Sequence, residues 1–322
     1  MSDSTLRPLF DRLNQQAGQE AGAPSAAAGG KMGERFVQLG LLTEEQVARV
    51  VELQQAERLR FGQAAVKLGF VSEARVQSVL AEQYRYDYAS AQHAEVKLPI
   101  AAMPFGREAE AIRQLRAEIS IRLEDLPRIT VAVVSPQDGE GRSYLSASLA
   151  IAFAQTGRRT LLVNANLRAS GQQELLGAGG GAGLSSILAG RAAAGESRAV
   201  AGFPALAVLD AGPQPPNPAE LLREPALVRV LAAYADPYEV FIVDTPPAAQ
   251  SPDAQSIARQ VDACVLVARK DVTSLGELAR TAEQLETAGA RVLGTVYNEY
   301  DPEGGRGWLA RLGALVPARL RR

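Results

Sequence analysis

A short glycine-rich turn, residues 135–143, constrains the fold of this 322-residue chain more than any other feature. The run before it, 129–134, reads Ile-Thr-Val-Ala-Val-Val and predicts a buried strand, and apolar residues after it recur at helical spacing up to Gly157. Gly139 and Gly141 permit close approach of the backbone to a phosphate chain, and amides at a helix start point toward its oxygens. The order strand, turn and helix therefore predicts a phosphate-binding loop. On these residues alone, a turn that binds no ligand is an equally good interpretation.

Individual positions of the turn have expected roles. Arg142 stands where such loops carry lysine, and Ser143 stands where a hydroxyl ligates Mg²⁺. Pro136 replaces the first glycine of the usual pattern. The residues that we expect to contact the nucleotide here are Asp138, Gly139, Glu140, Gly141, Arg142, Ser143 and Tyr144.

Two further apolar runs, 160–163 and 240–243, end in polar side chains. Ligands of open parallel sheets gather outside the carboxyl ends of the strands, so these side chains should converge on the phosphates. A carboxylate at the end of the second run, Asp244, is suited to hold Mg²⁺ together with Ser143. The converging side chains are Asn164, Asn166, Arg168 and Asp244.

These three motifs resemble the Walker-type motifs of the bacterial tyrosine kinases. Residues 215–222, Pro-Pro-Asn-Pro-Ala-Glu-Leu-Leu, resemble another hallmark of that family. Glu110, Arg113 and Arg116 match a spacing that in the family helps subunits pack into a ring. The match is best to the EpsG type of exopolysaccharide operons, and it covers roughly residues 31–300.

The resemblance implies a P-loop NTPase fold and an ATP- and Mg²⁺-dependent protein-tyrosine autokinase. It implies that Asn298 reads the adenine edge. In the family, aspartates stand at the positions of Asn164 and Asn166, the first as the base for the attacking tyrosine and the second as metal support. Asparagine accepts no proton, and losing a general base typically costs about 10²–10⁴-fold in rate. The catalytic positions carried over are Arg142, Asn164, Asn166, Arg168 and Asp244.

The resemblance also implies partners: a membrane chain-length-determinant protein and other copies of this chain, joined through the helix that carries Glu110, Arg113 and Arg116. The expected role is control of exopolysaccharide chain length by a cytoplasmic protein held at the inner membrane by its partner. One alternative is a catalytically weak nucleotide-binding regulator of the same machinery. A partition-type ATPase ranks last, because its second signature lysine is replaced here by Gln137.

Composition excludes several other classes. The net charge of −2 gives no reason to expect nucleic-acid binding. Cys264 lies in an apolar run and predicts a buried strand residue, and His93 has no nearby histidine or cysteine with which to bind a metal. No apolar run approaches the ~18 residues of a membrane span, so we expect a cytosolic protein.

Residues 31–83 contain an internal repeat in which the motif at Lys31, Gly33 and Gly40 recurs 29 residues later at Arg60. The repeat resembles the amino-terminal domain of type II secretion and pilus ATPases, whose tandem motif binds cyclic di-GMP. In that resemblance Arg60 packs on guanine and the glycines permit close backbone approach. A guanidinium both stacks on a base and neutralises a phosphate. Lys31 stands in place of the first arginine and weakens the half of the site that it would form. A helical docking module without a ligand is the alternative.

The predicted fold is α/β, a largely parallel sheet preceded by the small helical tandem-repeat domain. The expected strands are 129–134, 160–165, 206–210, 239–244, 262–268 and 291–297. The expected domains are a flexible segment 1–30, the helical domain 31–90, a linker 91–106, the kinase-like domain 107–302 and a basic tail 303–322.

Overall fold

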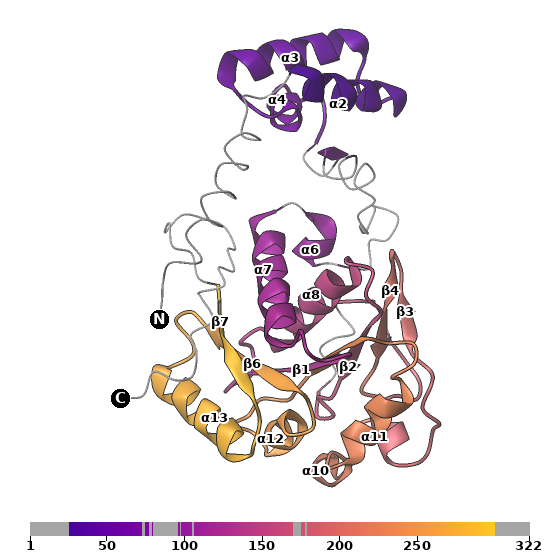
Figure 1. The fold of residues 1–322 in the computed structure, drawn as a ribbon, viewed down its shortest axis with the longest axis vertical. Coiled ribbons are helices and arrows are strands. Elements are labelled where there is room, and N and C mark those ends of the chain that lie inside the picture. Colours follow the sequence, from indigo (N-terminus) through magenta and orange to yellow (C-terminus); the bar gives the residue numbers. More distant parts are fainter. Residues whose placement is uncertain are drawn as a thin grey trace, which may run out of the picture. The chain divides into compact units, whose positions relative to one another are not determined.

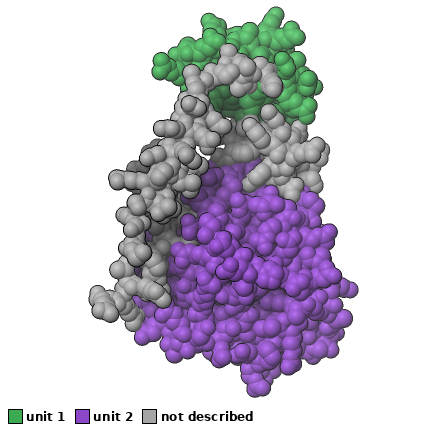
Figure 2. All heavy atoms as spheres, viewed as in Figure 1, with its two compact units in different colours: residues 1–83 green, residues 84–322 purple. Residues whose placement is uncertain are grey.

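The computed structural model describes residues 26–72, 75–76, 79, 96, 98–104, 106–169, 175–177 and 179–299. The chain forms two compact units, residues 1–83 and residues 84–322 (Figure 2). The predicted basic tail and most of the predicted flexible lead-in lie outside the described residues.

The larger unit is built on a seven-stranded sheet in the order β3-β4-β2-β5-β1-β6-β7. All neighbours pair in parallel except β3 and β4. The strands are β1 (Ile129–Val134), β2 (Thr160–Asn164), β3 (Arg198–Val200), β4 (Phe203–Leu209), β5 (Val240–Asp244), β6 (Ala263–Arg269) and β7 (Val292–Asn298). This confirms the largely parallel sheet, and β3 is the one strand among the described residues that the sequence did not predict. It is only three residues long, too short for a period-two pattern.

Helices cover both faces of this sheet (Figure 1). One face carries α6 (Pro99–Ala102), α7 (Arg107–Arg122) and α8 (Arg142–Ala154), and the other carries α11 (Ala226–Ala233), α12 (Asp253–Ala258) and α13 (Leu275–Thr287). The described residues of this unit also form the short helices α9 (Leu184–Leu188) and α10 (Pro218–Leu221). Strands buried on both faces are near-continuous apolar runs, which is why β1, β2 and β5 could be predicted from the sequence.

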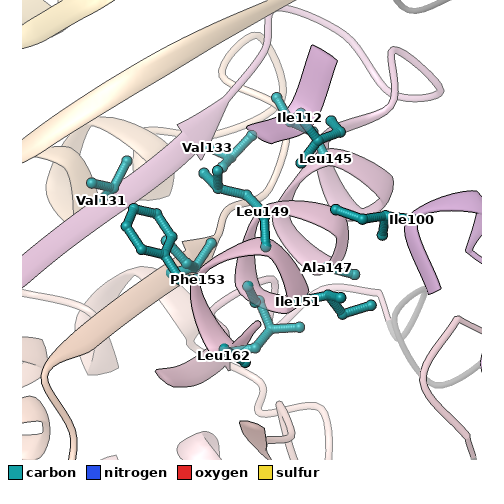
Figure 3. Close-up of a cluster of buried hydrophobic side chains, with 14 of the residues drawn as sticks. Ile100, Ile112, Val131, Val133, Leu145, Ala147, Leu149, Ile151, Phe153 and Leu162 are labelled. Carbon is teal, nitrogen blue, oxygen red and sulfur yellow. The ribbon is translucent and has the colours of Figure 1, made fainter. Parts of the chain in front are cut away.

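Helix α8 is fixed to the sheet by an apolar seam. Leu149 and Phe153 of α8 point toward Val131 and Val133 of β1, and all four are fully buried (Figure 3). Each such side chain contributes about 1.5–3 kcal/mol through burial. The turn between β1 and α8 is therefore held rigidly at both ends.

Helix α7 packs one apolar face, formed by Ile112, Leu115, Ile119 and the adjoining Leu123, into the same core. Part of the segment assigned to a linker does so as well: Leu98, Ile100 and Ala101 are buried, and residues 99–102 form α6. Pro99 is the first residue of α6, and proline is well tolerated in the first turn of a helix.

The smaller unit contains α2 (Ala26–Gln38), α3 (Glu44–Glu57) and α4 (Phe61–Lys67). Its contacts recur with the 29-residue offset of the repeat. A Cβ on Gly33 would lie 2.8 Å from Val47 Cγ1, and one on Gly62 would lie 2.5 Å from Val76 Cγ1. These two glycines thus permit close packing against side chains of their own unit. Helix α2 begins at Ala26, inside the segment predicted to be flexible.

The helix ends of this unit also repeat. Gly40 and Gly69 both have left-handed backbones, with φ of 65° and 70°. In each case the residue that follows the glycine donates its amide to a carbonyl five residues earlier. This geometry closes a helix without a Cβ penalty, which explains glycine at both positions.

Candidate nucleotide-binding site

The turn after β1 has the backbone of a phosphate loop. Gly139 and Gly141 have φ of 75° and 99°, values that side chains rarely tolerate. Gly141 is the N-cap of α8, so the first amides of that helix face the turn. These amides have no partner within the helix, and together with the helix dipole they favour an anion.

A hydroxyl and a carboxylate meet at the base of the turn. Ser143 Oγ donates to Asp244 Oδ2 at 2.6 Å, and Ser146 Oγ lies 3.4 Å from Asp244 Oδ1. Asp244 is buried at the carboxyl end of β5, directly beside Asn164 at the end of β2. The structure thus brings together Ser143 and Asp244, the two residues predicted to hold the metal.

The polar residues after β2 form a chain of hydrogen bonds. Asn164 Oδ1 accepts from the amide of Asn166 at 3.1 Å, and Asn166 Oδ1 accepts from the amide of Arg168 at 3.3 Å. Arg168 Nε donates to Asp253 Oδ2 at 2.8 Å, and this bond raises the pKa of Arg168. Both asparagines are buried. Their side chains, which were predicted to face the phosphates, are held in place by hydrogen bonds to backbone amides two residues further on.

Asp253 was not identified in the sequence analysis. It is buried in the first turn of α12, and its Oδ1 has no hydrogen-bond partner among the described residues. Its partner Arg168 lies 85 residues earlier, which is why the sequence offered no signal for the pair.

Arg142 is enclosed by the turn rather than extended from it. Its side chain is 4% exposed, and its Nε donates to the carbonyl of Thr245 at 3.0 Å. Its Nη1 donates to Ser135 Oγ at 2.6 Å and to the carbonyl of Gln137, and its Nη2 pairs with Asp138 Oδ1 at 3.0 Å. The residue in the lysine position therefore braces the loop from within.

Glu140 is a second internal brace. Its buried carboxylate accepts from the amide of Gln137 at 2.7 Å and from the hydroxyl of Thr273. Arg269, at the end of β6, donates to the carbonyl of Gly139 at 2.9 Å. Thr273 and Arg269 are loop-holding residues that the sequence analysis missed, because nothing in the sequence connects β6 with the turn.

Gln137, the position where a partition ATPase would carry its second lysine, donates to Glu277 Oε1 at 3.0 Å. Hydrogen bonds from Ser274 and then from Gln137 lower the pKa of Glu277. The turn is thus tied to α13 by a neutral amide instead of a cation.

Asn298 lies at the end of β7 and contacts the turn. Its Nδ2 donates to the carbonyl of Glu140 at 3.1 Å, and a Cβ on Gly141 would approach that nitrogen to 2.2 Å. In this structure the residue predicted to read adenine fastens the loop to the edge of the sheet.

Tyr144 lies in the contact between α7 and α8. Its hydroxyl donates to Glu108 Oε1. Burial raises the pKa of both groups, and the Glu108 carboxylate raises that of Tyr144 further. Tyr144 therefore links the first turn of α8 to α7, and its contact with the nucleotide stays a prediction.

The three residues expected at a subunit contact lie along α7. Arg113 donates to Glu110 Oε2 at 2.8 Å and to the carbonyl of Pro104. Arg116 donates to the carbonyl of Ala152 in α8 at 3.0 Å. Glu110 is exposed, while the Arg113 side chain is largely buried within the chain.

The residues present fit ATP and Mg²⁺ in part. Mg²⁺ is commonly bound through one or two carboxylates together with substrate phosphates, and Ser143 and Asp244 offer such oxygens side by side. No group of three or more His, Cys, Asp or Glu residues that could hold a metal on its own occurs in the described part of the chain. The same residues contain no helix long and apolar enough to cross a membrane.

The parallel sheet, the left-handed glycines before α8 and the paired Ser143 and Asp244 define a P-loop NTPase domain. The chain is 32% identical over 195 residues to tyrosine-protein kinase YwqD of Bacillus subtilis strain 168, covering 61% of this chain and 82% of YwqD. It belongs to the bacterial tyrosine kinase family. No family model matches the chain.

Solved structures agree with this assignment. The kinase domain of the Escherichia coli tyrosine kinase ETK matches with a TM-score of 0.60 at 25% identity, over 70% of this chain and 95% of that one. The chimerical protein CapA2B2 matches with a TM-score of 0.59 at 26% identity, over 70% and 99%. The chain is also 32% identical over 212 residues to EpsB of Ralstonia solanacearum, but it spans only 28% of that relative's length.

Proposed function

We propose that the larger unit binds ATP with Mg²⁺ at the 139–143 turn and transfers its γ-phosphoryl group slowly to tyrosine. The contact between Ser143 and Asp244 supports this proposal most directly, because it joins the two motifs that a nucleotide–metal complex must engage together. Mg²⁺, when bound, would neutralise charge that develops between the β- and γ-phosphates.

The chain's own groups have distinct tasks in this proposal. Amides of residues 139–143 bind the phosphates, and Arg168 faces the negative charge of the transferred group. Asn164 orients an incoming tyrosine hydroxyl, and the proton of that hydroxyl passes to a phosphate oxygen or to water, because an amide does not accept it. Phosphoryl transfer depends mostly on positioning and electrostatics, so slow turnover survives the loss of the base.

The decisive experiment is calorimetric titration of the full chain with ATP, with Mg²⁺ and with EDTA. Ser143→Ala and Asp244→Asn should weaken binding at least about tenfold with Mg²⁺ and much less with EDTA, because each removes one oxygen ligand or its charge. Asp262→Asn is the matched control, since Asp262 accepts from the amide of Thr130 at the opposite end of β1. Equal affinities for all four proteins with Mg²⁺ would refute the assignment.

We further propose the wider role that the family resemblance implies. In it the chain controls exopolysaccharide chain length beside a membrane chain-length-determinant protein, at the inner membrane, and self-associates through Glu110, Arg113 and Arg116. A catalytically weak regulator at the same place is the second candidate, and the two internal braces of the loop, Arg142 and Glu140, favour it. Radiolabelled ATP with and without the membrane partner distinguishes the two: incorporation into tyrosine supports the kinase, and binding without incorporation supports the regulator.

For the smaller unit we propose binding of cyclic di-GMP, carried mainly by Arg60. Arg60 is exposed at the N-cap of α4, so its guanidinium is available to a base and a phosphate. Titration of the full chain with cyclic di-GMP should show binding that Arg60→Ala abolishes. The control Arg58→Asn removes an equal charge at an exposed position whose φ of 54° asparagine tolerates. Absence of binding at high micromolar ligand leaves the docking-module alternative.

A further inference from the structure

We propose that Asp138 lowers the affinity of this site for nucleotide by competing with a phosphate for Arg142. The inference rests on the proposed function, since it names a residue that sets affinity at the same site. Its basis is the set of acceptors to which the N–H groups of the Arg142 guanidinium donate.

Arginine has five N–H donors. In Arg142 the Nε donor goes to the carbonyl of Thr245, and the two Nη1 donors go to Ser135 Oγ and the carbonyl of Gln137. One Nη2 donor goes to Asp138. Among the residues that the structure describes, four of the five donors are thus engaged by protein acceptors and one is not.

The four partners are not equally difficult to replace. Three of them are uncharged and belong to the loop itself or to the segment after β5, so losing them would disturb the turn. Asp138 is different, because its side chain is 76% exposed, so water can solvate its carboxylate when a phosphate oxygen takes its place beside the buried guanidinium. It is also the one partner that carries charge, and it neutralises the guanidinium that a phosphate oxygen would otherwise meet.

A phosphate that binds at the turn therefore has one route to a second Arg142 donor, which is to displace the Asp138 carboxylate. The exchange replaces one charge-assisted hydrogen bond with another. The phosphate therefore gains less binding free energy than it would from a guanidinium that has no counterion. A lysine at this position could not form this arrangement, since an ammonium is a compact charge that cannot reach four fixed acceptors at once.

The test is ATP titration of the full chain carrying Asp138→Asn, with Mg²⁺ at moderate salt. Removing the competing charge of an exposed pair should tighten ATP binding about three- to tenfold. Asp271→Asn is the matched control: it removes the same charge from a side chain that is 85% exposed, and asparagine tolerates its φ of 58°. It should leave the affinity unchanged.

A second comparison isolates the route through Arg142. In an Arg142→Lys background the Asp138→Asn change should have a smaller effect, because the fixed guanidinium fork has gone. Wild-type binding with no gain in Asp138→Asn, or with an equal gain in Asp271→Asn, would overturn the inference and leave the nucleotide site intact. Binding by neither the wild type nor Asp138→Asn would overturn the nucleotide site as well.

Discussion

Substituting Gly141 by alanine should destabilise the larger unit more than the same change at Gly139. Both glycines have positive φ, 99° and 75°, so an added Cβ costs about 1–2 kcal/mol of backbone strain at either position. At Gly139 nothing lies within 4 Å of the new atom, whereas at Gly141 it would meet Asn298 Nδ2 at 2.2 Å. The amide must then give up its 3.1 Å bond to the carbonyl of Glu140, which adds about 1 kcal/mol.

Urea unfolding of the full chain, followed by circular dichroism, measures this difference. The expected loss in unfolding free energy is about 1–2 kcal/mol for Gly139→Ala and about 1 kcal/mol more for Gly141→Ala. The entropy that alanine removes from the unfolded chain is the same in both variants, so it cancels in the comparison.

A double-mutant cycle with Asn298→Ala identifies the cause. In that background Gly141→Ala should cost no more than Gly139→Ala, because the amide that the Cβ meets has been removed. Equal losses for the two glycine variants in the wild-type background would refute the view that Asn298 fastens the loop through this contact.

Further predictions concern the ion pair of Arg168 with Asp253, the buried Cys264 and the two asparagines after β2. Arg168→Ala should reduce stability more than Asp253→Asn, because it leaves a buried carboxylate unpaired whereas the half-exposed arginine can be hydrated; urea midpoints decide this. Burial raises the pKa of Cys264 to about 12, so a disulfide reagent at pH 8 should label it only in urea. The folded thiol keeps its proton between pH 9 and 12 while the unfolded thiol loses it, so this group's contribution to stability should fall across that range. Asn164→Asp with Asn166→Asp should raise tyrosine phosphorylation on the order of 10²-fold in a radiolabel assay, and brisk wild-type activity without a gain would contradict the assigned roles.

The framework of the site was predictable because it depends on local signals. The run 129–134 is apolar and β-branched, and the glycines at 139 and 141 are the residues that a tight phosphate turn requires. Both signals act over a few residues, and the structure follows them at β1 and α8. The pairing of Ser143 with Asp244 was also predictable, since parallel strands bring their carboxyl ends to one edge.

The remaining features depend on contacts that no local pattern encodes. Arg269 reaches the carbonyl of Gly139 from 130 residues away, and Asp253 reaches Arg168 from 85 residues away. The direction of a long side chain is equally hidden: the position of Arg142 predicts a cation at the phosphates, but its burial among loop carbonyls appears only in three dimensions. The contact of Tyr144 with the half-buried Glu108 of α7 is hidden for the same reason, because the two residues lie 36 positions apart.

The asparagines after β2 have a consequence for stability as well as for rate. Asn164 lies directly beside Asp244, and both side chains are almost fully buried. An aspartate at this position would bring two carboxylates together at low dielectric, and such a pair is stable only if one is protonated or a cation lies between them. The asparagine avoids that repulsion, because its side chain carries no charge.

The double aspartate variant therefore distinguishes a kinase from a regulator by two independent readouts. Asn164 Oδ1 and Asn166 Oδ1 both accept backbone amides, and a carboxylate oxygen can accept the same bonds, so the local fold should survive. Without Mg²⁺ the variant should melt at a lower temperature than the wild type, and added Mg²⁺ should raise its melting temperature more than that of the wild type. If this metal response appears without a gain in phosphorylation, the site binds its cofactor but lacks more than a base, and the regulator is the better description. If both appear, the two amides alone separate this chain from a fast kinase.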